Sequence, residues 1–209
     1  MISVATMWDD GLVSDLKLIG ILKDLGLTAC FAISPDKHKS KREINDARGD
    51  YGTLVSKSEL KEFCGFEICN HTATHSNLNK VNLDKAIKEI VDGRKKLEDI
   101  FCRDVKGFCY PYGEYNNKIV NLLRGMNYLY ARTTKSGLTT HDNLLLHPTC
   151  RWNEIDVNKL NSFDGQLILW GHTYEIKSSS DWDSILNLYT FFKENSKIKL
   201  VTFNEMMGG

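Results

Sequence analysis

The feature that most constrains the fold is a regular alternation of short apolar runs with segments of helical periodicity. Residues 2–8 form the first apolar run. Residues 16–25 then carry leucine and isoleucine at helical spacing before Gly26, a residue typical of helix ends. The pattern continues along the chain and predicts strands over residues 2–8, 29–33, 66–69, 107–110, 128–132, 144–147, 166–170 and 199–203. Seven or eight strands that alternate with helices indicate a parallel α/β sheet, either open or closed into a barrel.

Local signals support several of the predicted helices. The clearest helix spans residues 83–101, where apolar residues recur along one face. Ser56 with Glu59 resembles a capping box that opens a short helix, and a similar pair, Ser180 with Asp183, opens a helix that runs through residue 192. The segment from residue 34 to residue 51 is polar and charged, which predicts a solvated insertion.

Composition narrows the class of protein. The 209 residues carry 27 Lys plus Arg and 27 Asp plus Glu, so the formal net charge is zero and nucleic acid is not expected as a partner. No apolar stretch approaches the roughly 18 residues that span a bilayer, and none has the form of a signal peptide. We therefore expect no membrane span and a cytoplasmic location. The six cysteines form no CxxC pair, which favours free thiols over a disulfide framework. No repeat or linker divides the chain, and we expect a single catalytic domain over residues 1–209.

Two carboxylates follow the first predicted strand directly. Ligand sites of parallel sheets lie at the carboxyl ends of the strands, so Asp9 and Asp10 stand where chemistry is expected. Taken alone, Asp-Asp-Gly is usually a turn. The functional interpretation is that one carboxylate binds a cation while the other stays free as a base.

Two histidines follow the third predicted strand. His71 and His75 are four residues apart, a spacing that lets both converge on one metal ion. Together with a strand-end aspartate they would make three ligands and leave one position open for water, which is the catalytic pattern of zinc and also suits ferrous iron.

Further polar groups follow later strands. His172 comes after the apolar run 166–170, where it could supply a proton across the mouth of the sheet. The sequence Tyr110-Pro111-Tyr112-Gly113 is a turn that could point a backbone N–H at a developing oxyanion.

In this order, the four motifs resemble the polysaccharide deacetylase family, which is carbohydrate esterase family 4 with its NodB-homology domain. The resemblance covers residues 6–172. It implies a distorted (β/α) barrel with about seven parallel strands. It also implies a metal-dependent hydrolase that removes an N-acyl group, such as acetyl, from an amino sugar or polysaccharide, and hence an N-acylated saccharide as the substrate.

The resemblance also implies roles for individual residues. Asp10, His71 and His75 would hold a divalent metal, zinc above all. Asp9 would be the general base and His172 the general acid. The backbone N–H of Tyr112 would help to bind the oxyanion.

The chain departs from the family pattern at two places. The family often has an arginine that steadies the catalytic base, and Cys109 stands there instead. The Asp and Trp of the family that adjust the acidic histidine have no clear counterpart. Arg132, at the end of the fifth strand, is hypothesised to supply the missing cation beside Asp9, against the alternative of an ordinary surface arginine.

Other functions remain open at this stage. One is a hydrolase of cyclic amides, ureides or formyl-amino sugars, and another is a non-catalytic carbohydrate-binding relative; a ferrous-iron oxygenase is disfavoured because helices separate the strands. Several further residues carry lesser expectations. His38 is expected to be solvated and His141 to lie in a loop, His147 and Glu175 are left open as pocket residues, and Trp8, Trp170 and Tyr112 are considered as flat faces for a sugar ring.

Overall fold

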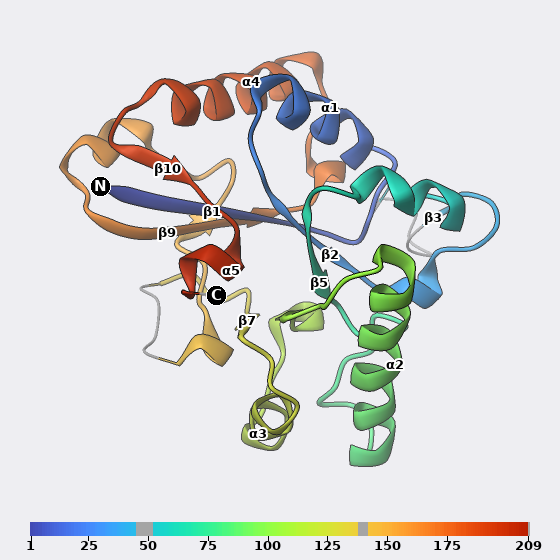
Figure 1. Ribbon diagram of the computed structural model, residues 1–209. Coiled ribbons are helices and arrows are strands. Elements are labelled where there is room, and N and C mark those ends of the chain that lie inside the picture. The colour runs from blue at the N-terminus through green and yellow to red at the C-terminus, as the bar shows by residue number, and fades with distance from the viewer. Residues whose placement is uncertain (45–51, 138–141, 209) are drawn as a thin grey trace.

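The fold is built on one curled parallel sheet. The computed structural model describes residues 1–44, 52–137 and 142–208. The strand β1 (Ile2–Asp9) lies between β2 and β9 in the order β7-β6-β5-β2-β1-β9-β8, and β10 (Ile198–Leu200) pairs with the first half of β1 (Figure 1). The other strands are β2 (Cys30–Ile33), β5 (Glu67–Asn70), β6 (Gly107–Cys109), β7 (Tyr130–Arg132), β8 (Cys150–Arg151) and β9 (Gly165–Gly171). Their pairings are all parallel, which confirms the expected distorted α/β barrel.

Helices cover the outside of this sheet. In Figure 1, α1 and α4 lie over one side and α2 and α3 lie over another. The α-helices are α1 (Asp15–Leu25), α2 (Leu83–Phe101), α3 (Asn117–Gly125), α4 (Ser179–Glu194) and α5 (Phe203–Met206). Short 3-10 turns lie between them: η1 (Pro35–Lys37), η2 (Lys57–Phe63), η3 (Pro111–Gly113), η4 (Asn143–Leu145), η5 (Val157–Ser162) and η6 (Thr173–Glu175). The strand β3 (Glu43–Ile44) falls in the predicted insertion and pairs antiparallel with β4 (Thr53–Leu54), which follows it.

The capping box of Ser56 is present and opens the predicted short helix, which is of the 3-10 type. Other predicted boundaries were wrong. The box that opens α4 uses Ser178 and Asp181, two residues earlier than predicted. The last predicted strand ends at residue 200, because Thr202 caps α5.

The predicted strand over 144–147 is also wrong, because no strand forms there. The wall of parallel strands is interrupted at this point, between β7 and β8, and we call this interruption the seam. β7 and β8 end the strand order without pairing to each other. Leu146 alone bridges to β7: its N–H donates to Ala131 O at 2.9 Å, and Thr133 N–H donates to Leu146 O at 2.9 Å. Three residues later, Thr149 N–H donates to Ile168 O of β9 at 2.8 Å. An irregular segment thus crosses from one edge of the sheet to the other.

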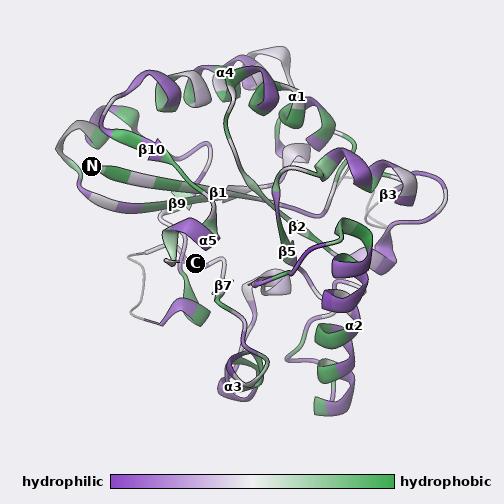
Figure 2. Cartoon of the chain, viewed as in Figure 1, coloured by the Kyte–Doolittle hydropathy of each residue, from purple (hydrophilic) through white to green (hydrophobic). Residues whose placement is uncertain are grey.

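The core has two layers because strand side chains alternate between faces. Figure 2 shows the apolar strands at the centre and polar helix surfaces outside. The outer layer packs the sheet against the helices. The inner layer fills the curl of the sheet with mostly small or sulfur-containing side chains, among them Ala5, Met7, Cys30, Ala32, Cys69, Cys109 and Ile168. Two residues further along four strands, the same inward face carries Asp9, His71, Arg132 and Trp170. The inner core therefore ends in a layer of polar and aromatic groups at the carboxyl ends of the strands.

Gly93 lets α2 pack closely on the loop that follows β5. A Cβ at this position would lie 2.5 Å from Asn70 Oδ1 and 2.9 Å from the amide nitrogen of Ala73. We expect Gly93→Ala to lower the free energy of unfolding by about 1–3 kcal/mol through overpacking. Urea unfolding measures this free energy.

The control is Gly20→Ala in α1, where nothing lies within 4 Å of the added methyl. This substitution should raise the free energy of unfolding by about 0.5–1 kcal/mol. Equal stability of the two variants would contradict the close packing.

The remaining general expectations can be compared with the structure directly. No helix within the described part of the chain is long and apolar enough to cross a membrane. All six cysteines are free; Cys30, Cys69 and Cys109 are buried, whereas Cys64 and Cys102 are exposed.

Candidate metal and catalytic centre

Asp10, His71 and His75 come together at the carboxyl ends of β1 and β5. Nε2 of His71 lies 3.9 Å from Asp10 Oδ1, and Nε2 of His75 lies 3.7 Å from the same oxygen. One ligand atom from each residue fits within 4.8 Å of the others. Bonds of about 2.0–2.2 Å from one ion would reach all three after small adjustments, so the set has the spacing of a metal site.

The histidines also have the right chemical state to bind a metal. Burial lowers the pKa of both His71 and His75 to about 4, so both imidazoles are neutral at neutral pH. Nδ1 of His71 lies 2.8 Å from the backbone oxygen of Cys109, to which it can only donate. This hydrogen bond fixes the tautomer and leaves the lone pair of Nε2 facing Asp10.

A second group, Asp9, His71 and Cys109, also brings possible ligand atoms within 4.8 Å of one another. It fits a cation less well. Burial raises the pKa of the Cys109 thiol well above its ordinary value, so the thiol keeps its proton. The carboxylate of Asp9 is already held by a guanidinium.

That guanidinium belongs to Arg132. Its Nη2 donates to both carboxylate oxygens of Asp9, at 2.6 and 2.5 Å, and both side chains are buried. Burial alone would raise the pKa of Asp9, but the charges of Arg132, His172 and His71 hold it below its ordinary value. Arg132 is thus not a surface residue, and it contacts Asp9 as hypothesised. It reaches Asp9 from the end of β7, whereas Cys109, at the position of the family arginine, ends β6.

His172 lies across from this pair. Its Nε2 is 3.9 Å from Asp9 Oδ2 and 3.9 Å from Asp10 Oδ2, and its Nδ1 is 3.2 Å from Glu175 Oε1. Burial lowers the pKa of His172, but the hydrogen bond to Glu175 and the nearby aspartates outweigh burial and raise it. Glu175 also accepts from Arg151 and, at 3.1 Å, from Trp152 Nε1.

Glu175 is therefore the carboxylate partner of His172, the histidine for which no counterpart of the family aspartate was found in the sequence. The only sequence signal was its position three residues after His172, which the 3-10 turn η6 converts into contact. The indole of Trp170 contacts the arginines of both ion pairs, Arg132 with Asp9 and Arg151 with Glu175. Each guanidinium lies 4.8 Å from its ring.

Unusual backbone conformations concentrate at this centre. Among the described non-glycine residues, six have positive φ, and four of them are Asp10 (85°), Thr72 (61°), His75 (61°) and Tyr112 (62°). Such conformations are costly for most residues and cluster at functional sites. Tyr112 exposes 60% of its side chain and packs edge-on against His75, with ring centroids 4.8 Å apart.

The expectations for His38 and Trp8 were wrong, whereas those for His147 and His141 are not decided. His38 is 3% exposed rather than solvated: it lies under Gly11, and its Nδ1 hydrogen-bonds Val55 O at 2.9 Å. Trp8 is 1% exposed and bonded to Tyr189, so it has no face for a sugar. His147 hydrogen-bonds Thr133. His141 falls outside the described residues.

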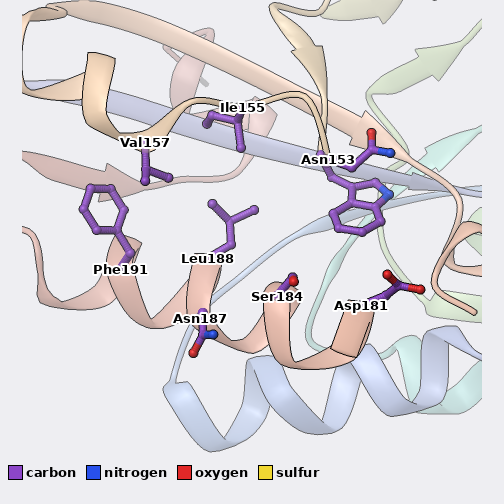
Figure 3. A pocket seen from close by; sticks show the side chains of 9 residues that line it. Asn153, Ile155, Val157, Asp181, Ser184, Asn187, Leu188 and Phe191 are labelled. Carbon is purple, nitrogen blue, oxygen red and sulfur yellow. The ribbon is translucent and has the colours of Figure 1, made fainter. Parts of the chain in front are cut away.

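The cavity in Figure 3 lies outside this centre. It has a volume of about 450 Å³ and lies between α4 and the segment 152–157, with Leu188 and Phe191 among its apolar lining. None of the seven predicted site residues lines it. Trp152 lines the cavity and also donates a hydrogen bond to Glu175.

The chain can now be compared with known proteins. A family model described as polysaccharide deacetylase matches residues 2–131, which is more than half of the chain. The chain belongs to this family. Within the polysaccharide deacetylases, a Bacillus subtilis protein that bears that name, YxkH, is 26% identical over 90 residues. These residues make up 42% of this chain and 32% of YxkH, so the match spans about a third of that relative.

Solved structures of polysaccharide deacetylases share the fold. The Bc1960 peptidoglycan N-acetylglucosamine deacetylase superposes with a TM-score of 0.67 at 18% identity, over 98% of this chain and 87% of that one. A second structure, a pseudoenzyme of carbohydrate esterase family 4 from Bacillus anthracis, has a TM-score of 0.63 at 14% identity, over 98% of this chain and 65% of that one. Since a pseudoenzyme shares the fold, the fold by itself does not show activity.

Proposed function

We propose that this protein is a metal-dependent deacetylase that hydrolyses the N-acetyl group of an amino sugar within a saccharide. The observation that carries the proposal is that two groups beside Asp10, His71 and His75 have pKa values shifted in opposite directions. The pKa of Asp9 is lowered and that of His172 is raised, with their side chains 3.9 Å apart. Groups whose pKa values are pushed apart in this way suit the base and acid of one reaction.

Each residue has a task that follows from its surroundings. Asp10, His71 and His75 would hold the metal, for which zinc is the best fit to the donors, and a bound divalent ion activates water and polarises a carbonyl. Asp9, kept ionised by Arg132, accepts the proton of the attacking water. His172, kept protonated by Glu175, donates a proton to the departing nitrogen. The backbone N–H of Tyr112 donates to the oxyanion.

The substrate assignment rests on the family and on one exposed ring. Tyr112 presents an aromatic face beside His75, and sugar rings pack well on such faces. The Bc1960 relative is a deacetylase of peptidoglycan N-acetylglucosamine, which supports an N-acetylated saccharide here.

The experiment is acetate release from N-acetylglucosamine oligomers by protein of known metal content. We expect release by the zinc-loaded protein, loss after chelation and recovery when zinc is returned. Asp10→Ala should lose both metal and release, whereas Asp164→Asn, which changes an exposed carboxylate, should lose neither. Cleavage of cyclic ureides or N-formyl sugars without acetate release would replace the proposed substrate. Binding of oligomers without cleavage of any of these would make the protein a carbohydrate-binding relative.

We expect activity to have a window in pH. It should rise as the pH rises through about 4, where His71 and His75 become neutral, and the lowered pKa of Asp9 favours its ionised form. It should fall as the pH rises through the raised pKa of His172, because the acid then loses its proton. Glu175→Gln removes a charge that raises this pKa, so the alkaline limb should move to lower pH. A kcat profile measures the shift, with Glu194→Gln, on the exposed end of α4, as control. If the alkaline side of the pH profile did not move, either His172 would not be the general acid or Glu175 would not be its partner.

A further inference from the structure

A buried contact between Asp15 and Thr173 ties the two catalytic loops together. Thr173 Oγ1 lies 2.6 Å from Asp15 Oδ1, and the N–H of Leu12 donates to Asp15 Oδ2 at 2.7 Å. Both Asp15 and Thr173 are 0% exposed. Each oxygen of the carboxylate therefore holds a different segment: one holds the loop after β1, and the other holds the turn after β9.

The hydroxyl of Thr173 lies between two oxygen atoms. Burial raises the pKa of Asp15 to about 7, and the ionised form of Asp15 accepts the one hydroxyl proton of Thr173. Ser14 Oγ lies 2.7 Å from Thr173 Oγ1, so in this form the serine donates to the threonine. A chain of bonds thus runs from Ser14 through Thr173 to Asp15, and a residue without a hydroxyl at position 173 breaks both of its links.

The two segments need such a tie because the ladder between β1 and β9 stops short of His172. This ladder ends with the pair Trp8 and Gly171. Asp9 is still held on its other side, where it pairs with Ala32 of β2, but His172 follows the end of β9 and no ladder sets its distance from Asp9. Beyond it the chain after β1 passes through two positive φ angles, 85° at Asp10 and 72° at Gly11, before α1 begins.

Thr173 is well placed to control the position of His172, the proposed general acid. It follows His172 directly and opens the turn η6, which also contains Glu175, the partner of His172 Nδ1. A shift of Thr173 would carry both the imidazole and its carboxylate with it. Displacements of about 1 Å in such constellations lower turnover by as much as about 100-fold.

We propose that Asp15 is a positioning residue that acts through Thr173 to set His172 relative to Asp9 and Asp10. The inference rests on the proposed function for its kinetic consequence, but the geometry it describes can be tested separately. Asp15 touches neither the metal set nor the reacting atoms, and nothing in the sequence motifs singled it out.

Three substitutions test the proposal in the zinc-loaded protein. Thr173→Val keeps the shape and removes the hydroxyl, and Asp15→Leu keeps a similar shape and removes both carboxylate oxygens. We expect each to lower kcat about 10- to 100-fold, with KM changed less than about twofold and with zinc content unchanged. Thr173→Ser keeps the hydroxyl and should restore kcat to within about threefold of the starting protein. Full kcat in both Thr173→Val and Asp15→Leu would overturn the proposal.

A matched control separates positioning from simple destabilisation. Thr202 caps α5 through its hydroxyl, which accepts from Glu205 N–H at 3.1 Å, and it does not contact the catalytic loops. Thr202→Val makes the same chemical change and should lower the melting temperature while leaving kcat unchanged at temperatures where the variant stays folded. If its kcat fell as far as that of Thr173→Val, a structural role would explain both and the inference would be wrong.

A spectroscopic readout keeps the test independent of turnover. The imidazole proton signals of His172, identified by their loss in His172→Gln, should shift in Thr173→Val and Asp15→Leu and return in Thr173→Ser. If the unsubstituted protein releases no acetate, the proposed function fails, and these shifts still decide whether Asp15 positions His172. Unshifted His172 signals in both variants would overturn the positioning role, whatever the substrate.

Discussion

Asp9→Asn should lower kcat for acetate release by about 10²- to 10⁴-fold, the range that general acid–base groups contribute, and leave zinc bound. The amide has almost the shape of the carboxylate but cannot take a proton from the attacking water. The metal set does not include Asp9, since Arg132 already occupies both of its oxygens. The variant therefore separates the base from the metal site.

The measurement for Asp9→Asn combines kinetics with metal analysis. Zinc content by mass spectrometry should match that of the parent protein, while acetate release falls at saturating substrate. Loss of zinc together with activity would mean that Asp9 belongs to the metal set, as the alternative group with His71 and Cys109 would require. Retained activity would remove Asp9 as the base.

Arg132→Met should lower the free energy of unfolding by about 3–5 kcal/mol. Methionine matches the volume of the arginine stem, but it leaves the carboxylate of Asp9 buried without its counter-charge. The guanidinium also packs on Trp170 and donates to Thr133 O at 3.0 Å, so several contacts are lost together. An exposed arginine such as Arg124, whose pair with Asp142 is partly solvated, should lose less than about 1 kcal/mol when changed in the same way.

A double variant identifies the source of the loss. Asp9→Asn combined with Arg132→Met removes both charges, and it should be more stable than Arg132→Met alone. Urea unfolding of the four proteins in the cycle gives the coupling energy directly. Additive effects would show that the two buried charges do not depend on each other. In Arg132→Met the pKa of Asp9 should rise, because burial is no longer opposed by the guanidinium, and activity at acidic pH should fall first.

The positions of the site residues were predictable from the sequence because parallel strands align their carboxyl ends. Asp10, His71 and His75 follow two different strands, and the geometry of the sheet brings such residues together whatever lies between them. The long helix α2 was also predicted with its observed bounds, since 19 residues give a clear period.

Other features depended on contacts that no local pattern contains. His38 lies in a charged stretch, yet its ring is buried because Gly11 leaves room for it. The run around Leu146 is apolar because it lines the closure of the barrel rather than because it forms a ladder of its own. Asp15 reads as an ordinary acidic residue in the first turn of a helix, and only the distant Thr173 gives it another partner.

The seam between β7 and β8 has a consequence for how this fold can diversify. Elsewhere in the wall, inserting or deleting a residue shifts a continuous ladder and every side chain that depends on it. In the described part of the segment from Thr133 to Thr149, Leu146 forms an isolated bridge to β7 and Thr149 bonds to β9, so the segment can change in length while the flanking strands keep their partners. This part of the rim offers evolution, and protein engineers, a place to reshape the entrance for a bulkier or differently decorated saccharide without rebuilding the centre.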